Sequence, residues 1–214
     1  MDIIYLDNHL LVVNKPAGQL VQGDHTGRPT LLDEARAWLK KEYNKPGNVY
    51  LGLVHRLDRP VSGVVVLART SKAASRLSSQ LRSHAPRKTY WARVEGKTPQ
   101  AATWTDYLVR HHFFAAIGSV HEGKEARLSL RRLDYRDNIS LVEIDLETGR
   151  YHQIRAQFSH HGHAIVGDRK YGSSHTLPPG IIALHAREMV ISHPTRGEEM
   201  HFVAEPAAGW PAIS

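Results

Sequence analysis

The chain has 214 residues, of which 41% are hydrophobic, and it contains no cysteine. This length is enough for one large or two small globular cores, and the lack of cysteine excludes disulfides, thiolate metal sites and cysteine nucleophiles. The net charge is +7 and the sequence pI is about 9.7, so nucleic acid is the first class of partner to consider. Because the sequence has neither a membrane-length apolar run nor a basic–apolar leader pattern, we expect a cytoplasmic protein.

The first part of the chain predicts a strand pair, a loop and a helix. Apolar residues 3–6 and 10–13 flank a polar triplet, which indicates two short strands joined by a turn. Residues 22–29 are polar and contain glycine, as loops do. Thr30 and Asp33 stand in the order of a capping box, and apolar residues follow at helical spacing, so we expect a helix directly after Thr30.

The most informative stretch lies between two apolar runs, residues 51–54 and 64–67. The second run is short and β-branched, which is typical of a strand covered on both faces and gives rigid support to its neighbours. Asp58 lies between the runs, flanked by Arg56 and Arg59. Adjacent arginines keep a carboxyl pKa at or below its usual value of about 3.9, so we expect Asp58 to be ionised and to act as a nucleophile or electrostatic group. An exposed Asp–Arg loop pair without function fits the spacing equally well.

The middle of the chain predicts a helix followed by strands. Residues 71–82 carry apolar side chains on one helical face, and residues 87–94 alternate as a strand does, with Tyr90 on the core side. A tyrosine in a strand more often serves packing than chemistry. Residues 127–133 and 139–146 also alternate and enclose a turn sequence, which predicts a hairpin.

We assign no catalytic or binding residues to two regions of the chain. A strand over residues 104–109 and a variable loop at 111–114 fit the first region. The second is a proline- and alanine-rich tail from about residue 205.

A second polar segment of interest lies at residues 148–162. Apolar residues there recur at helical spacing, and Gly162 is placed to end the helix. Arg155 lies on an adjacent stripe, from which a guanidinium can form a charge-assisted pair with a carboxylate at a strand end. His160 and His161 suggest metal ligands, but adjacent helical residues point about 100° apart and converge poorly on one ion. We therefore assign no metal.

Residues 55–63 read HRLDRPVSG and closely resemble the central motif of the RluA family of RNA pseudouridine synthases. In that family the aspartate of the motif is the catalytic nucleophile, so the resemblance places this role on Asp58. Residues 14–18, NKPAG, resemble the family's first motif, a segment that supports the catalytic loop. The chain has Val61 where the family usually has threonine, a change that affects a local hydrogen bond and leaves the carboxylate in place.

Two further segments continue the resemblance, which covers roughly residues 3–204. The residues around Tyr90 match a segment whose tyrosine stacks on the target base and is a candidate for removing the proton from C5. Residues 148–155, TGRYHQIR, match the third motif, whose final arginine, here Arg155, pairs with the nucleophilic aspartate. Many relatives have histidine where this chain has Gln157, and we expect a modest local change from that difference.

The resemblance implies an α+β protein with the pseudouridine synthase fold, in which a mixed, mostly antiparallel sheet with flanking helices surrounds a central active-site cleft. We expect one catalytic domain over residues 1–214, without a separate N-terminal RNA-binding domain, acting as a monomer. The implied reaction isomerises uridine to pseudouridine in ribosomal or transfer RNA and requires neither a cofactor nor a metal. The sequence has no Walker or dinucleotide glycine fingerprint, in agreement with this expectation.

A uridine stacked in RNA must be flipped out to reach such a site, at a cost on the order of a few kcal/mol. Arg56 is the candidate to fill the gap left by the base, and Lys15, Lys88 and Arg169 are candidates for phosphate contacts. Two alternatives stay open: a catalytically inactive RNA-binding protein on the same fold and, more remotely, a metal hydrolase that uses the histidine cluster.

Overall fold

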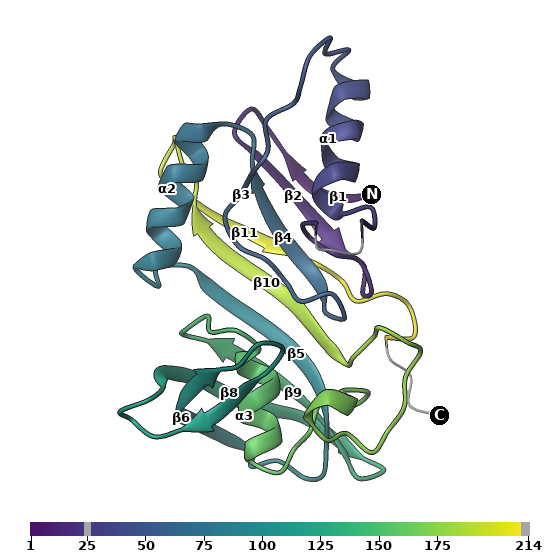
Figure 1. The fold of residues 1–214 in the computed structure, drawn as a ribbon, viewed down its shortest axis with the longest axis vertical. Coiled ribbons are helices and arrows are strands. Elements are labelled where there is room, and N and C mark those ends of the chain that lie inside the picture. Colours follow the sequence, from purple (N-terminus) through teal and green to yellow (C-terminus); the bar gives the residue numbers. More distant parts are fainter. Residues whose placement is uncertain (24–26, 211–214) are drawn as a thin grey trace. The chain divides into compact units, whose positions relative to one another are not determined.

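The computed structural model describes residues 1–23 and 27–210, and the chain forms two compact units (Figure 1). Unit 1 comprises Met1–Pro86 and Arg187–Ala207, and unit 2 comprises Arg87–Ala186 with the described residues from Ala208 onward. Unit 1 is therefore built from both ends of the sequence. A single catalytic domain over residues 1–214 stays a prediction.

Unit 1 contains two helices and a set of mainly short strands. These elements are β1 (Asp2–Leu6), β2 (Leu10–Lys15), α1 (Leu31–Glu42), β3 (Gly52–Leu53), β4 (Ser62–Ala68), α2 (Ser71–Arg82), β11 (Glu199–Val203) and the part of β10 (Leu184–Ser192) from Arg187 onward. Antiparallel pairs join β1 to β2, β2 to β4, β3 to β4, and β10 to β11. The predicted strand pair at the N-terminus and the two predicted helices are confirmed.

The capping box of α1 is formed as predicted. The Thr30 hydroxyl accepts a hydrogen bond from the Asp33 amide, and the Asp33 carboxylate accepts one from the Thr30 amide. The polar loop predicted at residues 22–29 includes residues 24–26, which lie outside the described residues. On either side of that loop, Leu20 and Thr30 form an isolated parallel bridge.

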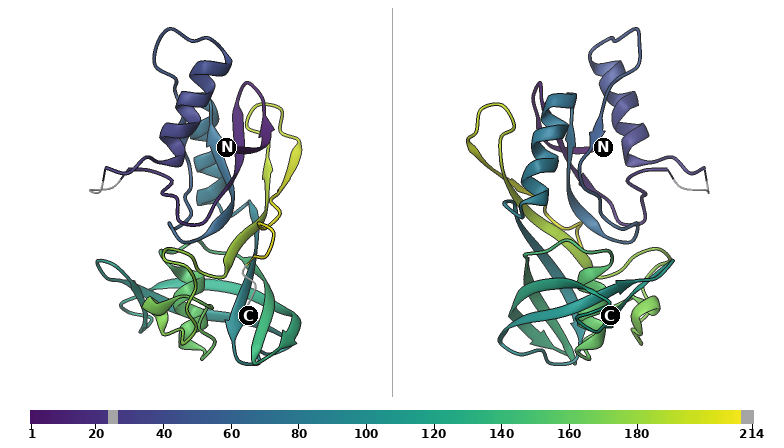
Figure 2. Two further views of the ribbon diagram at one scale, coloured as in Figure 1. Left: turned by 90° about the vertical axis from the view of Figure 1, so that its right-hand side faces the viewer. Right: turned by 60° about the vertical axis from the view of Figure 1, so that its left-hand side comes forward.

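Every residue of β4 is buried, as the sequence predicted for a strand covered on both faces. Val64 and Val66 pack in one cluster with Ala73 and Leu77 of α2, and both helices flank the strands of unit 1 (Figure 2). Full burial of one such valine contributes roughly 1.5–3 kcal/mol. The loop that precedes β4 therefore has a rigid support.

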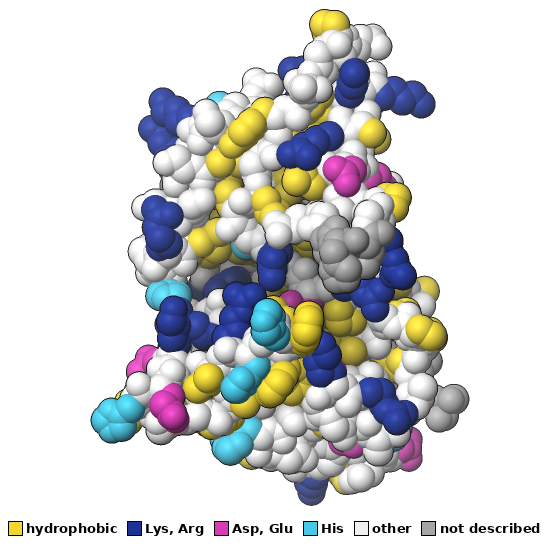
Figure 3. All heavy atoms as spheres, in the orientation of Figure 1, with side chains coloured by type: hydrophobic (Ala, Val, Ile, Leu, Met, Phe, Trp, Pro, Cys, Tyr) yellow, Lys and Arg dark blue, Asp and Glu magenta, His cyan; other side chains and the backbone are white. Residues whose placement is uncertain are grey.

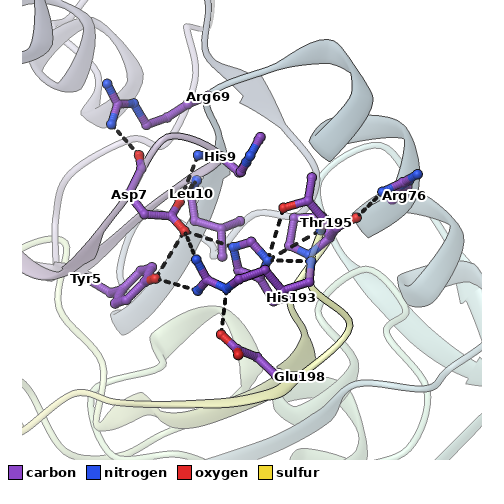
Figure 4. Close-up of polar contacts among 11 residues, drawn as sticks. Tyr5, Asp7, His9, Leu10, Arg69, Arg76, His193, Thr195 and Glu198 are labelled. Atoms are coloured by element: carbon purple, nitrogen blue, oxygen red, sulfur yellow. Dashed lines mark hydrogen bonds and ion pairs between the residues drawn. The ribbon is translucent and has the colours of Figure 1, made fainter.

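A polar cluster joins the turn after β1 to the β10–β11 hairpin (Figure 4). The Asp7 carboxylate accepts hydrogen bonds from the amides of His9 and Leu10, both at 2.7 Å, and from His193 Nε2 at 2.8 Å. Burial alone raises the pKa of Asp7, but these hydrogen bonds and one from the Tyr5 hydroxyl outweigh it and lower the pKa to about 2. Asp7 therefore stays ionised and connects the two ends of the chain within unit 1.

Unit 2 is an antiparallel sheet with one helix packed against it (Figure 2). Its elements are β5 (Arg87–Glu95), β6 (Ala101–Arg110), β7 (Ala115–Gly118), β8 (Lys124–Arg136), β9 (Ile139–Leu146), α3 (Gln153–His160) and the 3₁₀ turn η1 (Arg169–Tyr171). The strand order is β5-β9-β8-β6-β7. The predicted β8–β9 hairpin is confirmed, and its turn residues Asp137 and Asn138 have φ values of 51° and 59°, which these residue types tolerate.

Helix α3 begins later than the sequence predicted. Its periodicity includes Tyr151, but His152 adopts a left-handed φ of 52° and the helix starts at Gln153. The Gln153 side chain accepts a hydrogen bond from the Thr148 hydroxyl at 2.8 Å, so a local side-chain contact replaces the first turn. Gly162 follows the helix with a φ of 81°, as predicted for its end.

The α+β class with mostly antiparallel strands and flanking helices is confirmed. None of the helices in the described part of the chain is long and apolar enough to cross a membrane.

Candidate active site

The loop that carries Asp58 is fixed by backbone hydrogen bonds. The Val61 amide donates to the Asp58 carbonyl at 3.1 Å, and the Gly18 amide donates to the Arg59 carbonyl at 2.8 Å. The Val61 side chain is buried, whereas Asp58 is only partly buried. The NKPAG segment thus contacts the Asp58 loop directly, in agreement with the supporting role expected for it.

Lys15 is fully buried at the end of β2. Its ammonium donates to the carbonyls of Pro16 and Gln19, both at 2.9 Å, and of Arg59 at 3.3 Å. Burial lowers the pKa of Lys15 to about 7, and the charge of Asp58 acts in the opposite direction. The predicted phosphate contact of Lys15 is wrong, because its side chain is enclosed and its ammonium is bound to carbonyls. Lys15 instead connects β2 to the Asp58 loop.

The residues beside Asp58 differ in exposure. His55 Nε2 accepts a hydrogen bond from the Val66 amide of β4 at 2.9 Å, so the start of the motif is also attached to the buried strand. Arg56 and Arg59 are exposed. Arg56 is accessible to a ligand, and its entry into the gap left by a flipped base stays a prediction.

Arg155 of α3 is 6% exposed and forms a bidentate pair with Asp168. Its Nε lies 2.6 Å from one carboxylate oxygen and its Nη2 lies 2.9 Å from the other. The guanidinium also lies 4.9 Å from the centre of the Tyr171 ring. This pair fixes the guanidinium plane. Pairing of Arg155 with Asp58 stays a prediction.

Sequence reasoning missed Asp168, which is 1% exposed. The available signal is a single acidic residue in the turn at residues 167–172, directly before the basic pair that suggests a phosphate contact. Arg169 is exposed and donates to the Thr176 hydroxyl at 3.3 Å. It is therefore accessible, and its phosphate contact stays a prediction.

Tyr171 connects η1 to two other elements of unit 2. Its hydroxyl lies 2.9 Å from His152 Nδ1 and accepts a hydrogen bond from the Ala115 amide of β7 at 2.8 Å. Burial raises the pKa of Tyr171 to about 12, so the hydroxyl keeps its proton at neutral pH and can donate to His152. No pattern in the sequence predicts this network.

Tyr90 lies in β5 opposite Ile144 of β9 and is partly buried. It shares a strand face with Ala92, which is fully buried, so its predicted orientation toward the core side is confirmed. Lys88 is also partly buried, and burial lowers its pKa. The base-stacking role of Tyr90 and the phosphate contact of Lys88 stay predictions.

The histidine that directly follows α3, His161, takes part in packing. His161 stacks on Trp104 with ring centres 4.1 Å apart and contacts the Asp106 carboxylate at 3.1 Å. Gln157, which replaces the family's usual histidine, donates to the same carboxylate at 2.7 Å. Within residues 1–23 and 27–210, no group of three or more His, Cys, Asp or Glu side chains is arranged to hold a metal ion.

In the view of Figure 3, Lys and Arg side chains are spread over the surface of each unit, with few Asp and Glu side chains among them. This distribution matches the net charge of +7. A surface of this kind attracts polyanions.

The sequence model of the family described as RNA pseudouridylate synthase matches residues 9–160. The chain belongs to this family. Ribosomal large subunit pseudouridine synthase D of Zymomonas mobilis is 35% identical over 220 residues, which cover 96% of the chain and 69% of that protein. tRNA pseudouridine synthase C of Pectobacterium carotovorum is 32% identical over 250 residues, covering 100% of the chain and 61% of that protein.

Among solved structures, human RNA pseudouridylate synthase domain containing 4 matches the pseudouridylate synthase fold of this chain with a TM-score of 0.80. The identity is 25%, and the match covers 97% of this chain and 89% of the human one. The predicted fold family is therefore confirmed. The chain spans roughly two thirds of the length of the curated relatives that it matches.

Proposed function

We propose that this pseudouridylate synthase family member isomerises uridines to pseudouridines in ribosomal or transfer RNA. The observation that carries the proposal is the Asp58 loop, which is anchored to buried β4 and to the ammonium of Lys15. The relatives named above act, by their names, on ribosomal and transfer RNA. We further propose that the protein acts as a monomer in the cytoplasm, where these RNAs are found.

The reaction breaks the bond from C1′ of the ribose to N1 of uracil and forms a bond from C1′ to C5. The hydrogen at C5 leaves as a proton, and N1 gains one. Because atoms and electrons balance without an added reactant, the isomerisation consumes neither a redox cofactor nor a nucleotide.

Asp58 is the proposed reacting carboxylate, with Arg155 as its charge partner and Tyr90 as the ring that contacts the target base. A carboxylate on a rigid loop can attack the sugar or the base without reorganising its support. The bidentate pair of Arg155 with Asp168 supports this role, since it orients the guanidinium before RNA binds.

RNA binding is assigned to exposed or partly exposed cations. Arg56 is the proposed side chain that replaces a flipped uridine, and Lys88 and Arg169 are the proposed phosphate contacts. Their exposure at the surface supports these roles, as does the excess of positive charge.

The experiment uses purified protein and total RNA labelled with tritium at C5 of uridine. Formation of pseudouridine releases tritium to water, and we expect release by the wild-type protein. Asp58→Asn should lower the rate at least about 1000-fold, because the amide is a poor nucleophile, while affinity for the RNA persists.

Asp137→Asn is the matched control, since it makes the same chemical change in the exposed β8–β9 turn. It should leave the rate unchanged. Tritium release by Asp58→Asn at the wild-type rate would contradict the assignment. RNA binding by the wild-type protein without any tritium release would favour the inactive RNA-binding alternative.

A further inference from the structure

The tip of the β6–β7 hairpin presents four rings to solvent. Residues 111–114 read HHFF, and Phe113 and Phe114 are 69% and 44% exposed. His111 stacks on Phe114 with ring centres 4.6 Å apart and planes 18° apart, and the rings of His112 and Phe113 lie 5.6 Å apart. Adjacent exposed rings of this size mark a contact surface more often than a chance exposure.

The tip is attached to the same part of unit 2 that orients Arg155. Lys170 Nζ donates to the Phe113 carbonyl at 3.0 Å, and the Ala115 amide donates to the Tyr171 hydroxyl at 2.8 Å. The Tyr171 ring in turn lies against the Arg155 guanidinium. The C-terminal side of the tip is thus fixed to η1, and the His111 amide closes the tip by donating to the Phe114 carbonyl at 2.9 Å, so the exposed rings stand on an ordered support.

The charge around the tip is positive. The exposed Arg110 directly precedes the tip in the sequence, and the exposed Lys170 contacts it in the structure. No acidic residue occurs from Tyr107 to His121. In Figure 3, histidine and hydrophobic side chains lie together on the surface of unit 2, among Lys and Arg. Stacked rings bordered by cations are the arrangement that binds single-stranded nucleic acid, because bases stack on the rings and phosphates meet the cations.

We propose that the tip at residues 111–114 stacks on unpaired bases of the RNA substrate. This inference rests on the proposed function and adds to it a preference for loops and single strands over continuous duplex. A uridine in such a region is also the easiest to flip, because fewer stacking contacts are lost. The tip would therefore select the same RNA regions in which the isomerisation costs least.

Leucine and tryptophan variants separate base stacking from ordinary apolar contact. Phe113→Leu/Phe114→Leu keeps the apolar surface and removes both phenyl rings, whereas Phe113→Trp/Phe114→Trp keeps rings that stack on bases. A protein partner or a second copy of this chain would tolerate leucine, but a nucleobase would not gain the same stacking from it. Tyr135→Leu is the matched control, because Tyr135 is an exposed ring, 38% exposed, near the other hairpin turn of unit 2.

The probe is a fluorescent 12-nucleotide single-stranded RNA of mixed sequence, free or annealed to its complement, with Kd measured by anisotropy at one salt concentration. We expect the leucine variant to raise Kd for the single strand about tenfold and to leave Kd for the duplex within about twofold. The tryptophan variant and Tyr135→Leu should both bind the single strand within about twofold of wild type.

An unchanged Kd of the leucine variant for the single strand would overturn the inference, as would an equal loss for single strand and duplex. Concentration-dependent dimerisation that the leucine variant keeps, with RNA affinity unchanged, would favour a second copy of the chain as the occupant of the tip instead. Tritium release by the wild-type protein is measured in parallel. Its absence would overturn the proposed function, whereas its presence with unchanged RNA affinity in the leucine variant would overturn this inference alone.

Discussion

Two buried cations lie in the two units and are stabilised in different ways. Lys15 in unit 1 is 0% exposed and donates to three backbone carbonyls, with the Asp58 charge near enough to affect its pKa. Arg155 in unit 2 is 6% exposed and shares two hydrogen bonds with the carboxylate of Asp168. Carbonyl dipoles satisfy the donors of a cation, but only a carboxylate also neutralises its charge.

The difference appears in how firmly each charge is fixed. Burial lowers the pKa of Lys15 to about 7, so its protonation changes near neutral pH. A guanidinium keeps its proton in proteins, and a bidentate carboxylate also fixes its plane. Arg155 therefore supplies a constant, oriented charge, while Lys15 supplies a hydrogen-bonded support for the Asp58 loop whose charge depends on pH.

The largest expected effect comes from removing the carboxylate from the Arg155 pair. Asp168→Ala should lower the free energy of unfolding by about 3–5 kcal/mol, because it removes the bidentate partner of a buried guanidinium. Chemical denaturation of the full chain measures this change.

Two control variants test whether burial of the Arg155–Asp168 pair causes the large loss of stability. Glu198→Ala removes a carboxylate from a solvent-exposed pair with Arg196, in which the arginine side chain is 46% exposed. It should lower stability far less than Asp168→Ala does, because water screens an exposed pair. Arg155→Met/Asp168→Leu replaces the whole pair by apolar side chains and should regain part of the loss. Equal losses of unfolding free energy for Asp168→Ala and Glu198→Ala would show that burial of the pair does not set the cost.

The next effect is a pH dependence caused by Lys15. Its pKa is lower in the folded protein than in the unfolded chain, where it is near 10.5, so the unfolded state binds more protons between these values. The free energy of unfolding should therefore rise with pH from about 7 to 10.5, by about 2 kcal/mol between pH 7 and 9. Denaturation curves of wild type and Lys15→Met give this contribution as the difference between the two proteins.

Asp58→Asn sharpens this test. The charge of Asp58 raises the pKa of Lys15, so its removal should move the Lys15 titration to lower pH, as seen by NMR of the lysine side chain. A flat difference between wild type and Lys15→Met from pH 7 to 9 would show that Lys15 keeps an ordinary pKa, and the comparison of the two cations would fail.

The smallest effect concerns Asp7 in unit 1, whose negative charge is stabilised by hydrogen bonds. The pKa of Asp7 is lowered to about 2, so its contribution to stability is complete above its unfolded value of 3.8 and is lost as pH falls toward 2. Asp7→Asn should cost about 1 kcal/mol at pH 7 and flatten the stability profile between pH 4 and 2. Loss of stability at the same rate in wild type and variant over this range would contradict the assignment to Asp7.

Much of the fold could be predicted from local signals. The Thr30 capping box, the alternation of β8 and β9 and the Asp137–Asn138 turn are each set by residues close in sequence. The four residues of β7 were missed because so short a strand has no readable period. The start of α3 was missed because the left-handed His152 is accompanied by a contact with Tyr171, nineteen residues away.

In the candidate active site too, contacts between residues distant in sequence could not be predicted. The motifs indicated Asp58, Tyr90 and Arg155, but no pattern in the sequence reports that Lys15 is buried. That burial is accompanied by a hydrogen bond to the Arg59 carbonyl, which is supplied by a loop 44 residues later. The choice of Asp168 as partner of Arg155 depends likewise on how η1 packs beside α3, since side-chain pairs between elements have no local period.

The proposed function depends most on Asp58 as the group that isomerises uridine. The most direct measurement maps pseudouridines at single-nucleotide resolution in total RNA from cells that lack this gene and from the same cells expressing wild type or Asp58→Asn. We predict that one or more positions in ribosomal or transfer RNA are pseudouridine only with the wild-type protein. Identical maps for all three strains, or restoration of the same positions by Asp58→Asn, would contradict it.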